Sequence, residues 1–249
     1  MGSEMCIRDS SYTGLGIAFN GGTATTGTTS LNLNQWYHVA ATRASGTVKL
    51  FVNGTQIQSA TNSANISDGT APFVIGAATS GSNYEYESKM YMKDARFVNG
   101  TAVYTSGFTA PTESLTAITN TKLLTCNLPY ITDGSTTGHT ITVNGDPSTE
   151  PFGPFDYQTY NAAANSGSMS LDGTSDRISA AASTDFGFGT GDFTVEYWIY
   201  LNSISNYPCG FDMRSADNDT PLSVFIQTAS SNPVSYTHLR AHETSLHLV

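Results

Sequence analysis

An alternating pattern of apolar and polar residues predicts the best-defined strand of the chain at Phe193–Leu201, FTVEYWIYL. Its odd-numbered positions are all apolar and would share one face, whereas Thr194, Glu196, Trp198 and Tyr200 would share the other. A period of two in β-branched and aromatic residues is typical of a half-buried strand. The pattern therefore places the odd-numbered face against a core.

Two hairpin strands precede it in the first quarter of the chain. Asn53-Gly54 can supply the two positive φ angles of a type I′ turn, which would pair residues 49–52 with residues 55–58. Residues 36–43, WYHVAATR, predict a third strand. Further short strands, each bounded by turn-forming residues, are predicted at residues 15–19, 72–77, 88–92, 95–98, 122–126, 139–143, 168–171, 177–180 and 222–227. Many short strands separated by turns indicate an all-β, antiparallel jelly-roll sandwich.

Two stretches lack this alternation. Residues 101–117 have few alternating apolar positions, and residues 146–165 hold three of the nine prolines. Because proline removes a backbone donor from the ladder, the second stretch cannot be a central strand. We expect both to be linkers or caps, and the second to separate two units.

Composition excludes several classes of protein. Twenty acidic residues against ten basic ones give a formal net charge of −10. Such a chain has no cationic surface for phosphates, so no nucleic acid is expected as a partner. Lys, Glu and Leu are too scarce for a helical bundle. No apolar run reaches the ~20 residues of a membrane span, and no signal peptide is evident.

The two ends differ in composition from the middle. Residues 1–10, MGSEMCIRDS, and residues 234–249, VSYTHLRAHETSLHLV, resemble translated sequencing-adapter read-through at the ends of metagenomic gene fragments. We set both apart as non-native tails, so that residues 11–233 would be a fragment of a longer reading frame. The second tail reads H-E-x-x-x-H from His242, one residue longer than a zinc-protease motif, and predicts no metal site.

Three longer runs resemble one known family. LNQWYHVAATRASGTVKLFVNGTQI is similar to the core hairpins of laminin-G-like, concanavalin A-like jelly-roll domains, and SMSLDGTSDRISAAASTDFGFGTGDFTVEYWIYL to their opening strands. ARFVNGTAVYTSGFTAP followed by TKLLTC resembles the closing strand in laminin-G-like proteins of marine phages and bacteria. The resemblance covers most of residues 11–228. It implies a lectin-like sandwich in a virion or an extracellular bacterial protein.

The order of these runs differs from the family order, in which the opening strands come first. Residues 11–127 resemble the later strands of one repeat, and residues 166–233 resemble the early strands of a second. Residues 128–165 form a Pro/Gly-rich connection. Our hypothesis is that the two halves of this tandem protein complete one circularly permuted sandwich, since half a sandwich would leave open sheet edges.

Aromatic residues are the main candidates for ligand binding, because sugars pack against exposed rings. Trp198, Tyr200 and Glu196 share the polar face of their strand and could form a glycan platform, as the resemblance implies. The alternative is that a second layer or loop covers that face. Tyr84 and Tyr86, in NYEYES, are weaker candidates. We assign Trp36 to the core.

Calcium is the candidate metal, because related domains sometimes bind it through loop carboxylates. Asp212, Asp217 and Asp219 in DMRSADNDT could supply oxygen ligands, although the EF-hand spacing is absent. The alternative is an ordinary acidic turn, and otherwise no cofactor is expected. Cys126 and Cys209 are expected as small buried thiols, while a disulfide between them stays open.

No catalytic residues are expected. Glycosidases of the related fold carry three acids spaced E-x-D-x-x-E, and Glu85 and Glu87 lack the third. The chain is therefore predicted to be a non-enzymatic module that binds a glycan or cell-surface polysaccharide in a phage structural protein or an adhesin. The alternatives are a glycoside hydrolase and a purely architectural repeat that contacts neighbouring repeats of the same chain.

Overall fold

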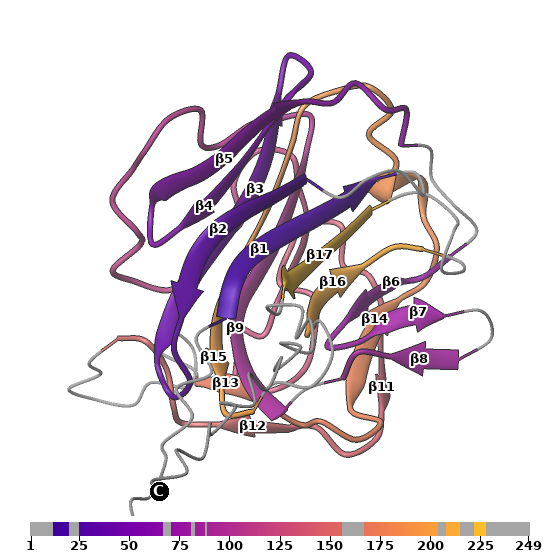
Figure 1. Ribbon diagram of the computed structural model, residues 1–249. Helices are drawn as coiled ribbons and strands as arrows, with labels where there is room; N and C mark the ends of the chain where they lie inside the picture. The colour runs from indigo at the N-terminus through magenta and orange to yellow at the C-terminus, as the bar shows by residue number, and fades with distance from the viewer. Residues whose placement is uncertain are drawn as a thin grey trace, which may run out of the picture.

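The computed structural model describes residues 12–19, 25–66, 71–80, 83–87, 89–155, 167–203, 208–214 and 222–227. In these ranges the chain forms two antiparallel sheets that pack face to face (Figure 1). The one helical element among them is the short 3-10 turn η1 (Thr184–Phe186). The all-β antiparallel sandwich predicted from the sequence is confirmed. Within the same ranges, no helix has the length and apolarity to cross a membrane.

The strands are arranged in two large sheets and one small hairpin. The front sheet of Figure 1 has the order β11 (Ile141–Asn144), β14 (Arg177–Ala180), β6 (Phe73–Ile75), β16 (Cys209–Asp212), β17 (Leu222–Gln227), β1 (Tyr12–Phe19) and β2 (Thr25–Leu31). The back sheet has the order β12 (Ser148–Glu150), β13 (Ser168–Asp172), β9 (Lys89–Asn99), β15 (Phe193–Leu201), β3 (Trp36–Ala44), β4 (Thr47–Val52) and β5 (Thr55–Thr61), with β10 (Thr121–Thr125) also paired to β9. The hairpin is β7 (Ala78–Ser80) with β8 (Asn83–Glu85).

Strands from the two halves of the sequence alternate within both sheets. In the front sheet β6 lies between β14 and β16, and in the back sheet β15 lies between β9 and β3. The described strands between residues 12 and 125 and those between residues 167 and 227 therefore share the same two sheets. The domain boundaries at residues 127 and 166, and the assignment of the halves to two repeats, stay predictions.

The core lies between the sheets, and β15 contributes one face to it. The odd-numbered side chains from Phe193 to Leu201 are all at most 3% exposed and belong to the core cluster. Tyr197 packs directly over Gly210, where an added Cβ would overlap the tyrosine hydroxyl. The face predicted from alternation is thus the buried face.

Several local predictions differ from the structure. The strands predicted at residues 88–92 and 95–98 are one strand, β9, interrupted at Asp94, whose φ is 53°. Strands β2, β7, β8 and β16 lie outside the predicted ranges. The turn at Asn53-Gly54 is confirmed, with φ angles of 48° and 76°. The edge strand β12 lies inside the predicted linker, where it is not a central strand.

Candidate functional site

The outer face of the back sheet carries rows of side chains across β3, β15 and β9. Strand register places the central residue of each row beside one neighbour on either side. The four rows are Trp36–Tyr200–Tyr91, His38–Trp198–Lys93, Ala40–Glu196–Arg96 and Thr42–Thr194–Val98. Along β15, the face therefore changes from aromatic through charged to hydroxyl-bearing.

Glu196 lies at the centre of a buried polar network. Its Oε1 accepts hydrogen bonds from Arg96 Nε at 2.9 Å and Arg96 Nη2 at 2.6 Å. Its Oε2 accepts from the Tyr104 hydroxyl at 2.7 Å and lies 3.2 Å from His38 Nε2. Burial alone would raise the pKa of Glu196, but the hydrogen bond with His38 and the charge of Arg96 hold it below its ordinary value. Glu196 is therefore an ionised carboxylate whose oxygens are occupied by protein donors.

Residues 101–118, which we call the covering segment, lie over this part of the face. The rings of Tyr104 and Phe108 stack with centroids 3.6 Å apart, and both rings meet the edges of His38 and Phe51. The Thr42 hydroxyl donates to the Tyr104 carbonyl at 2.9 Å. Hydrogen bonds to polar side chains of the sheet thus hold the covering segment in place.

This arrangement corrects the expected open platform. Glu196 is fully buried and Trp198 is 8% exposed, with the ring of Phe155 5.4 Å from the indole. The side chains do share one face, as alternation predicts, but that face is covered around them. The alternative prediction, that a second layer or loop covers this face, agrees with the structure around Glu196 and Trp198.

Lys93 and Asp94 form a second buried pair beside the first. Lys93 Nζ lies 3.3 Å from Asp94 Oδ1, and both side chains are fully buried. Asp94 Oδ2 accepts a hydrogen bond from the Leu115 amide at 3.0 Å, which joins the covering segment to β9. Burial raises the pKa of Asp94 to about 6, although Lys93 opposes the shift.

We expect this carboxyl to make stability depend on pH. Since the pKa of Asp94 is raised from 3.8 to about 6, the folded chain retains a proton that the unfolded chain releases in that interval. The contribution of the protonated Asp94 carboxyl to the free energy of unfolding is complete below pH 3.8 and is lost as the pH rises through 6. Between pH 4 and 7, wild-type unfolding free energy should fall by up to about 3 kcal/mol relative to Asp94→Asn. Urea unfolding across this range measures the difference, and a difference that does not change with pH contradicts the prediction.

The uncovered end of the face is an aromatic cluster of Trp36, Tyr91, Phe152 and Tyr200. The Tyr200 centroid lies 5.4 Å from that of Trp36, 5.9 Å from that of Tyr91 and 4.9 Å from that of Phe152. Phe152 is 37% exposed, and the other three rings are half-buried. These rings form a partly exposed surface at one end of the sheet.

Trp36 corrects a prediction, because it belongs to this cluster and not to the core. Its neighbour Tyr37 faces the core, so alternation along β3 directs Trp36 outward. The indole nitrogens Nε1 of Trp36 and Trp198 are both buried, and no described residue offers either an acceptor. The only two tryptophans of the chain thus lie in adjacent rows with unpaired donors.

The remaining tyrosine candidates lie beside the other sheet. The Arg177 guanidinium carbon lies 3.8 Å from the ring centroid of Tyr84 on β8. Tyr86 lines a cavity of about 170 Å³ together with Arg214, Ser223 and Phe225. The structure therefore does not bring Tyr84 and Tyr86 into one site with Trp198 and Tyr200.

Asp212, the first residue of the expected calcium loop, is occupied by protein donors. It is fully buried, and it accepts from Arg214 Nε at 2.7 Å and from the Thr79 amide at 2.6 Å. Burial raises its pKa. Asp217 and Asp219 lie outside the described residues. Asp212 thus does not offer a free carboxylate for a metal ion.

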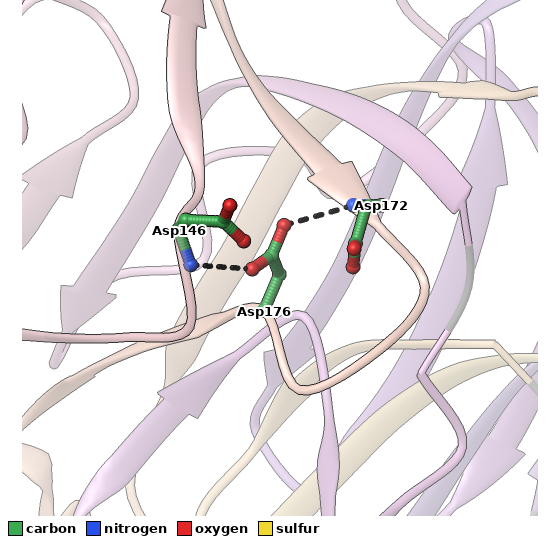
Figure 2. A group of neighbouring side chains, drawn as sticks. All are labelled: Asp146, Asp172 and Asp176. Carbon is green, nitrogen blue, oxygen red and sulfur yellow. Dashed lines mark hydrogen bonds between the residues drawn. The ribbon is translucent and has the colours of Figure 1, made fainter.

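A different acidic group, missed from the sequence, is formed by Asp146, Asp172 and Asp176 (Figure 2). One carboxylate oxygen from each lies within 4.8 Å of the others. Asp176 is 3% exposed and accepts from the Asp146 amide at 2.8 Å and the Asp172 amide at 2.9 Å. Oxygen ligands of this kind suit Ca²⁺. The pairing of β11 with β14 brings Asp146 to the other two, and no sequence spacing signals it.

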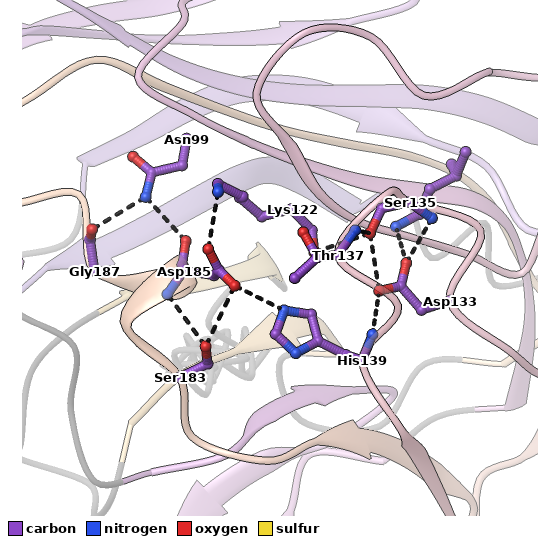
Figure 3. Close-up of polar contacts among 10 residues, drawn as sticks. Asn99, Lys122, Asp133, Ser135, Thr137, His139, Ser183, Asp185 and Gly187 are labelled. Atoms are coloured by element: carbon purple, nitrogen blue, oxygen red, sulfur yellow. Dashed lines mark hydrogen bonds and ion pairs between the residues drawn. The ribbon is translucent and has the colours of Figure 1, made fainter.

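Figure 3 shows a further polar group that links η1 to the connection. Asp185 accepts from Lys122 Nζ at 2.8 Å and lies 3.5 Å from His139 Nε2. The side-chain amide nitrogen Nδ2 of Asn99 donates to the backbone carbonyls of Asp185 and Gly187. Lys122 and Asp185 form an ion pair, and Asp133 accepts hydrogen bonds from the amides of Ser135 and His139, so the arrangement serves to hold these segments together.

Cys126 and Cys209 are buried and free, as expected for small buried thiols. Burial raises the pKa of each to about 12. Both therefore stay protonated at neutral pH, and neither is a reactive nucleophile.

Comparison with known proteins gives one match. Residues 7–101 match a laminin-G family model described as the concanavalin A-like lectin/glucanases superfamily. The match begins at Ile7, inside the first predicted tail, so it gives no support to treating residues 1–10 as non-native. No curated protein and no solved structure matches the chain significantly. The chain is thus similar to laminin-G-like, concanavalin A-like domains, which are in general carbohydrate-binding or structural modules.

Proposed function

We propose that this chain is a non-enzymatic module that binds neutral carbohydrate through the rings of Trp36, Tyr91 and Tyr200 in the aromatic cluster. One observation carries the proposal: three partly exposed rings stand side by side on adjacent strands, next to two indole N–H groups to which no described residue offers an acceptor. The likeness to the concanavalin A-like superfamily supports it.

Rings and unpaired donors together suit a sugar. The C–H faces of a pyranose pack against aromatic rings, while its hydroxyl and ring oxygens accept hydrogen bonds. A buried donor without a partner costs about 1–3 kcal/mol. A ligand that supplied acceptors to Trp36 and Trp198 would remove this cost.

Phe152 and Phe155 stand where such a ligand would sit. The Phe152 ring contacts Trp36, Tyr91 and Tyr200, and the Phe155 ring contacts Trp198. A phenyl ring covers apolar surface but accepts no conventional hydrogen bond. We therefore expect these two rings to move aside when a sugar reaches the indole donors.

The charge of the chain favours an uncharged glycan. With a formal net charge of −10, the protein would repel an acidic polysaccharide at long range. The setting stays part of the proposal: a virion or an extracellular protein, where the module would act in adhesion or contact neighbouring repeats.

A glycoside hydrolase is the alternative from the same superfamily. A retaining hydrolase needs two accessible carboxyl groups about 5–5.5 Å apart. Glu196 is fully buried among donors, and Glu87 Oε2 accepts from the Ser175 amide at 2.9 Å. These contacts favour binding without catalysis.

Intrinsic fluorescence offers a direct test, because both tryptophans of the chain lie at the proposed site. Titration with laminarin, xylan and mannan should change the emission with at least one of them. Tyr200→Ala should weaken that binding about tenfold or more, as expected when a central ring of an interface is removed. Calorimetry gives the affinity.

Tyr130→Ala is the matched control, since Tyr130 is 60% exposed and is not part of the cluster. It should bind as the wild type does. The proposal fails if no neutral glycan binds, or if Tyr200→Ala and Tyr130→Ala lose the same affinity.

A further inference from the structure

A short segment directly after β12 lies on the proposed carbohydrate site. It consists of residues 151–155, PFGPF, which we call the strap. The ring centroid of Phe152 lies 5.3 Å from that of Trp36. It lies 4.9 Å from the ring centroids of both Tyr91 and Tyr200. One ring of the strap thus contacts all three rings that we propose for sugar binding.

The second ring of the strap extends this cover along the sheet. Phe155 has its ring centroid 5.4 Å from that of Trp198, which precedes Tyr200 by two positions on β15. Lys93 Nζ, in the same row as Trp198, lies 6.0 Å from the Phe155 centroid. The two phenyl rings of the strap therefore cover two adjacent rows of the face.

The strap is held by its rings more than by its backbone. Strand β12 is fixed up to its last residue, Glu150, because it pairs with β13 and because Thr149 Oγ1 donates to the Pro129 carbonyl at 2.9 Å. After β12, the Phe152 amide donates to the Glu150 carbonyl at 2.8 Å, which closes a turn at the start of the strap. Among the described residues, residues 152–154 make no hydrogen bond to a strand of either sheet.

The covering segment on the same face is anchored differently. Its Val103 amide donates to Thr194 Oγ1 at 2.8 Å, and its Leu115 amide donates to Asp94 Oδ2 at 3.0 Å. A segment with few hydrogen bonds to its surroundings opens at a lower free-energy cost than a segment with many. Of the two segments that cover this face, the strap is therefore the one that can leave it.

The chemistry of the strap does not match the surface beneath it. The side chains of Pro, Phe and Gly offer no hydrogen-bond acceptor. The Nε1 atoms of Trp36 and Trp198 are buried donors to which no described residue offers an acceptor. The strap thus supplies ring contacts and leaves these donors unpaired, whereas a sugar supplies apolar C–H faces and acceptors together. This difference in contacts favours exchange of the strap for a sugar.

We infer that the strap is an intramolecular competitor for the carbohydrate site, which lies on the rings of Trp36, Tyr91 and Tyr200 until a sugar displaces it. The inference rests on the proposed function and adds the regulation of that site. Because a sugar binds only molecules in which the strap is open, the apparent dissociation constant is the intrinsic constant divided by the open fraction. A strap that is closed in about nine of ten molecules weakens binding about tenfold.

Removing the Phe152 ring should therefore strengthen binding. In titrations with laminarin, xylan and mannan, the dissociation constant of each polysaccharide that binds should be about tenfold lower for Phe152→Ala than for the wild type. Stopped-flow tryptophan fluorescence should show a higher association rate constant and an unchanged dissociation rate constant, because the strap opens before the sugar enters. Phe152→Leu keeps an apolar side chain without a ring, and it should show a smaller gain in affinity.

Ile118→Ala is the matched control, and it should bind as the wild type does. It also removes an apolar side chain, which is 40% exposed in Ile118 and 37% exposed in Phe152. Without sugar, acrylamide should quench the tryptophan emission of Phe152→Ala more strongly than that of the wild type or of Ile118→Ala, because the ring over Trp36 is gone. Circular dichroism and urea unfolding show whether the variants are folded.

The outcomes separate the strap from the site that it covers. If Phe152→Ala binds no more tightly than the wild type while Tyr200→Ala loses affinity, the strap is not a competitor and the carbohydrate site stands. A gain in affinity that arises only from slower dissociation overturns the inference as well. If neither the wild type nor Phe152→Ala binds any of the three polysaccharides, the proposed function is wrong and the inference falls with it.

Discussion

Replacing Glu196 with alanine should lower the free energy of unfolding by about 3–5 kcal/mol, the loss expected when one member of a buried ion pair is removed. Arg96 is 6% exposed and donates two hydrogen bonds to this carboxylate, so the variant leaves a buried guanidinium without its counter-ion, while its hydrogen bond to the Thr116 carbonyl remains. Tyr104 also loses its acceptor, and with it a link between the covering segment and the sheet. Urea unfolding measures the change.

Two further variants show whether the loss of stability comes from breaking a buried ion pair or from removing any acidic side chain. Glu85→Ala removes an exposed carboxylate and should change stability by less than about 0.5 kcal/mol. The double variant Glu196→Leu with Arg96→Met should recover much of the loss, because an apolar pair has no charge to desolvate. A loss below about 1 kcal/mol in Glu196→Ala would contradict the network.

The same carboxylate should lose its effect in acid. The pKa of Glu196 in the folded state lies below its ordinary 4.5. The contribution of this carboxylate to the free energy of unfolding is therefore complete above pH 4.5, and it is lost as the pH falls through the lowered pKa of the folded state. The difference between the wild type and Glu196→Ala should therefore shrink below pH 4.5.

Arg43→Ala should be comparably damaging, with an expected loss of about 4 kcal/mol. Arg43 is fully buried and donates to the carbonyls of Gly191 at 2.8 Å, Ala64 at 2.8 Å and Gly189 at 2.6 Å. Hydrogen bonds to a charged group contribute about 1.5–3 kcal/mol each, and three carbonyls would lose the guanidinium donor, of which only that of Gly189 keeps a further donor, the Ile66 amide, among the described residues. Its guanidinium carbon also lies 5.2 Å from the Phe188 ring centroid, so packing is lost with the charge.

Arg43→Lys tests whether shape matters beyond charge. An ammonium group cannot reach three carbonyls in the geometry of a planar guanidinium, so this variant should recover only part of the loss. Lys122→Ala is the control: Lys122 is 32% exposed in its pair with Asp185, and its loss should cost at most about 1 kcal/mol. Equal unfolding energies for Arg43→Ala and Lys122→Ala would contradict the assignment.

Strands with a strong alternation of apolar and polar residues were predictable from the sequence. Strands that form only because they pair with a neighbouring strand were not. Phe193–Leu201 shows a period of two, and its apolar face is the core face found in the structure. Thr25–Leu31, TTGTTSL, has no alternation, and it is a strand because it pairs with β1. Pairing is a long-range interaction that the local sequence does not report.

The candidate site was predictable in part. Alternation correctly placed Tyr200 and Trp198 on the face opposite the core. It did not say which face of residues 36–43 is buried, because both faces carry a large aromatic residue, Trp36 or Tyr37. The group of Asp146, Asp172 and Asp176 was missed because Asp172 and Asp176 are close in the chain, but Asp146 joins them only through the pairing of β11 with β14.

The sequence by itself determined the class of fold, the buried face of β15, the turn at Asn53-Gly54 and the acidic charge of the chain. These features depend on short-range backbone preferences and on composition, which the order of residues contains directly. Only the tertiary structure decided that the covering segment buries Glu196, and that Trp36, Tyr91 and Tyr200 stand in one row. Such contacts join residues more than 90 positions apart in the sequence. They form only when the sheets are assembled, because the register between paired strands brings these distant side chains together.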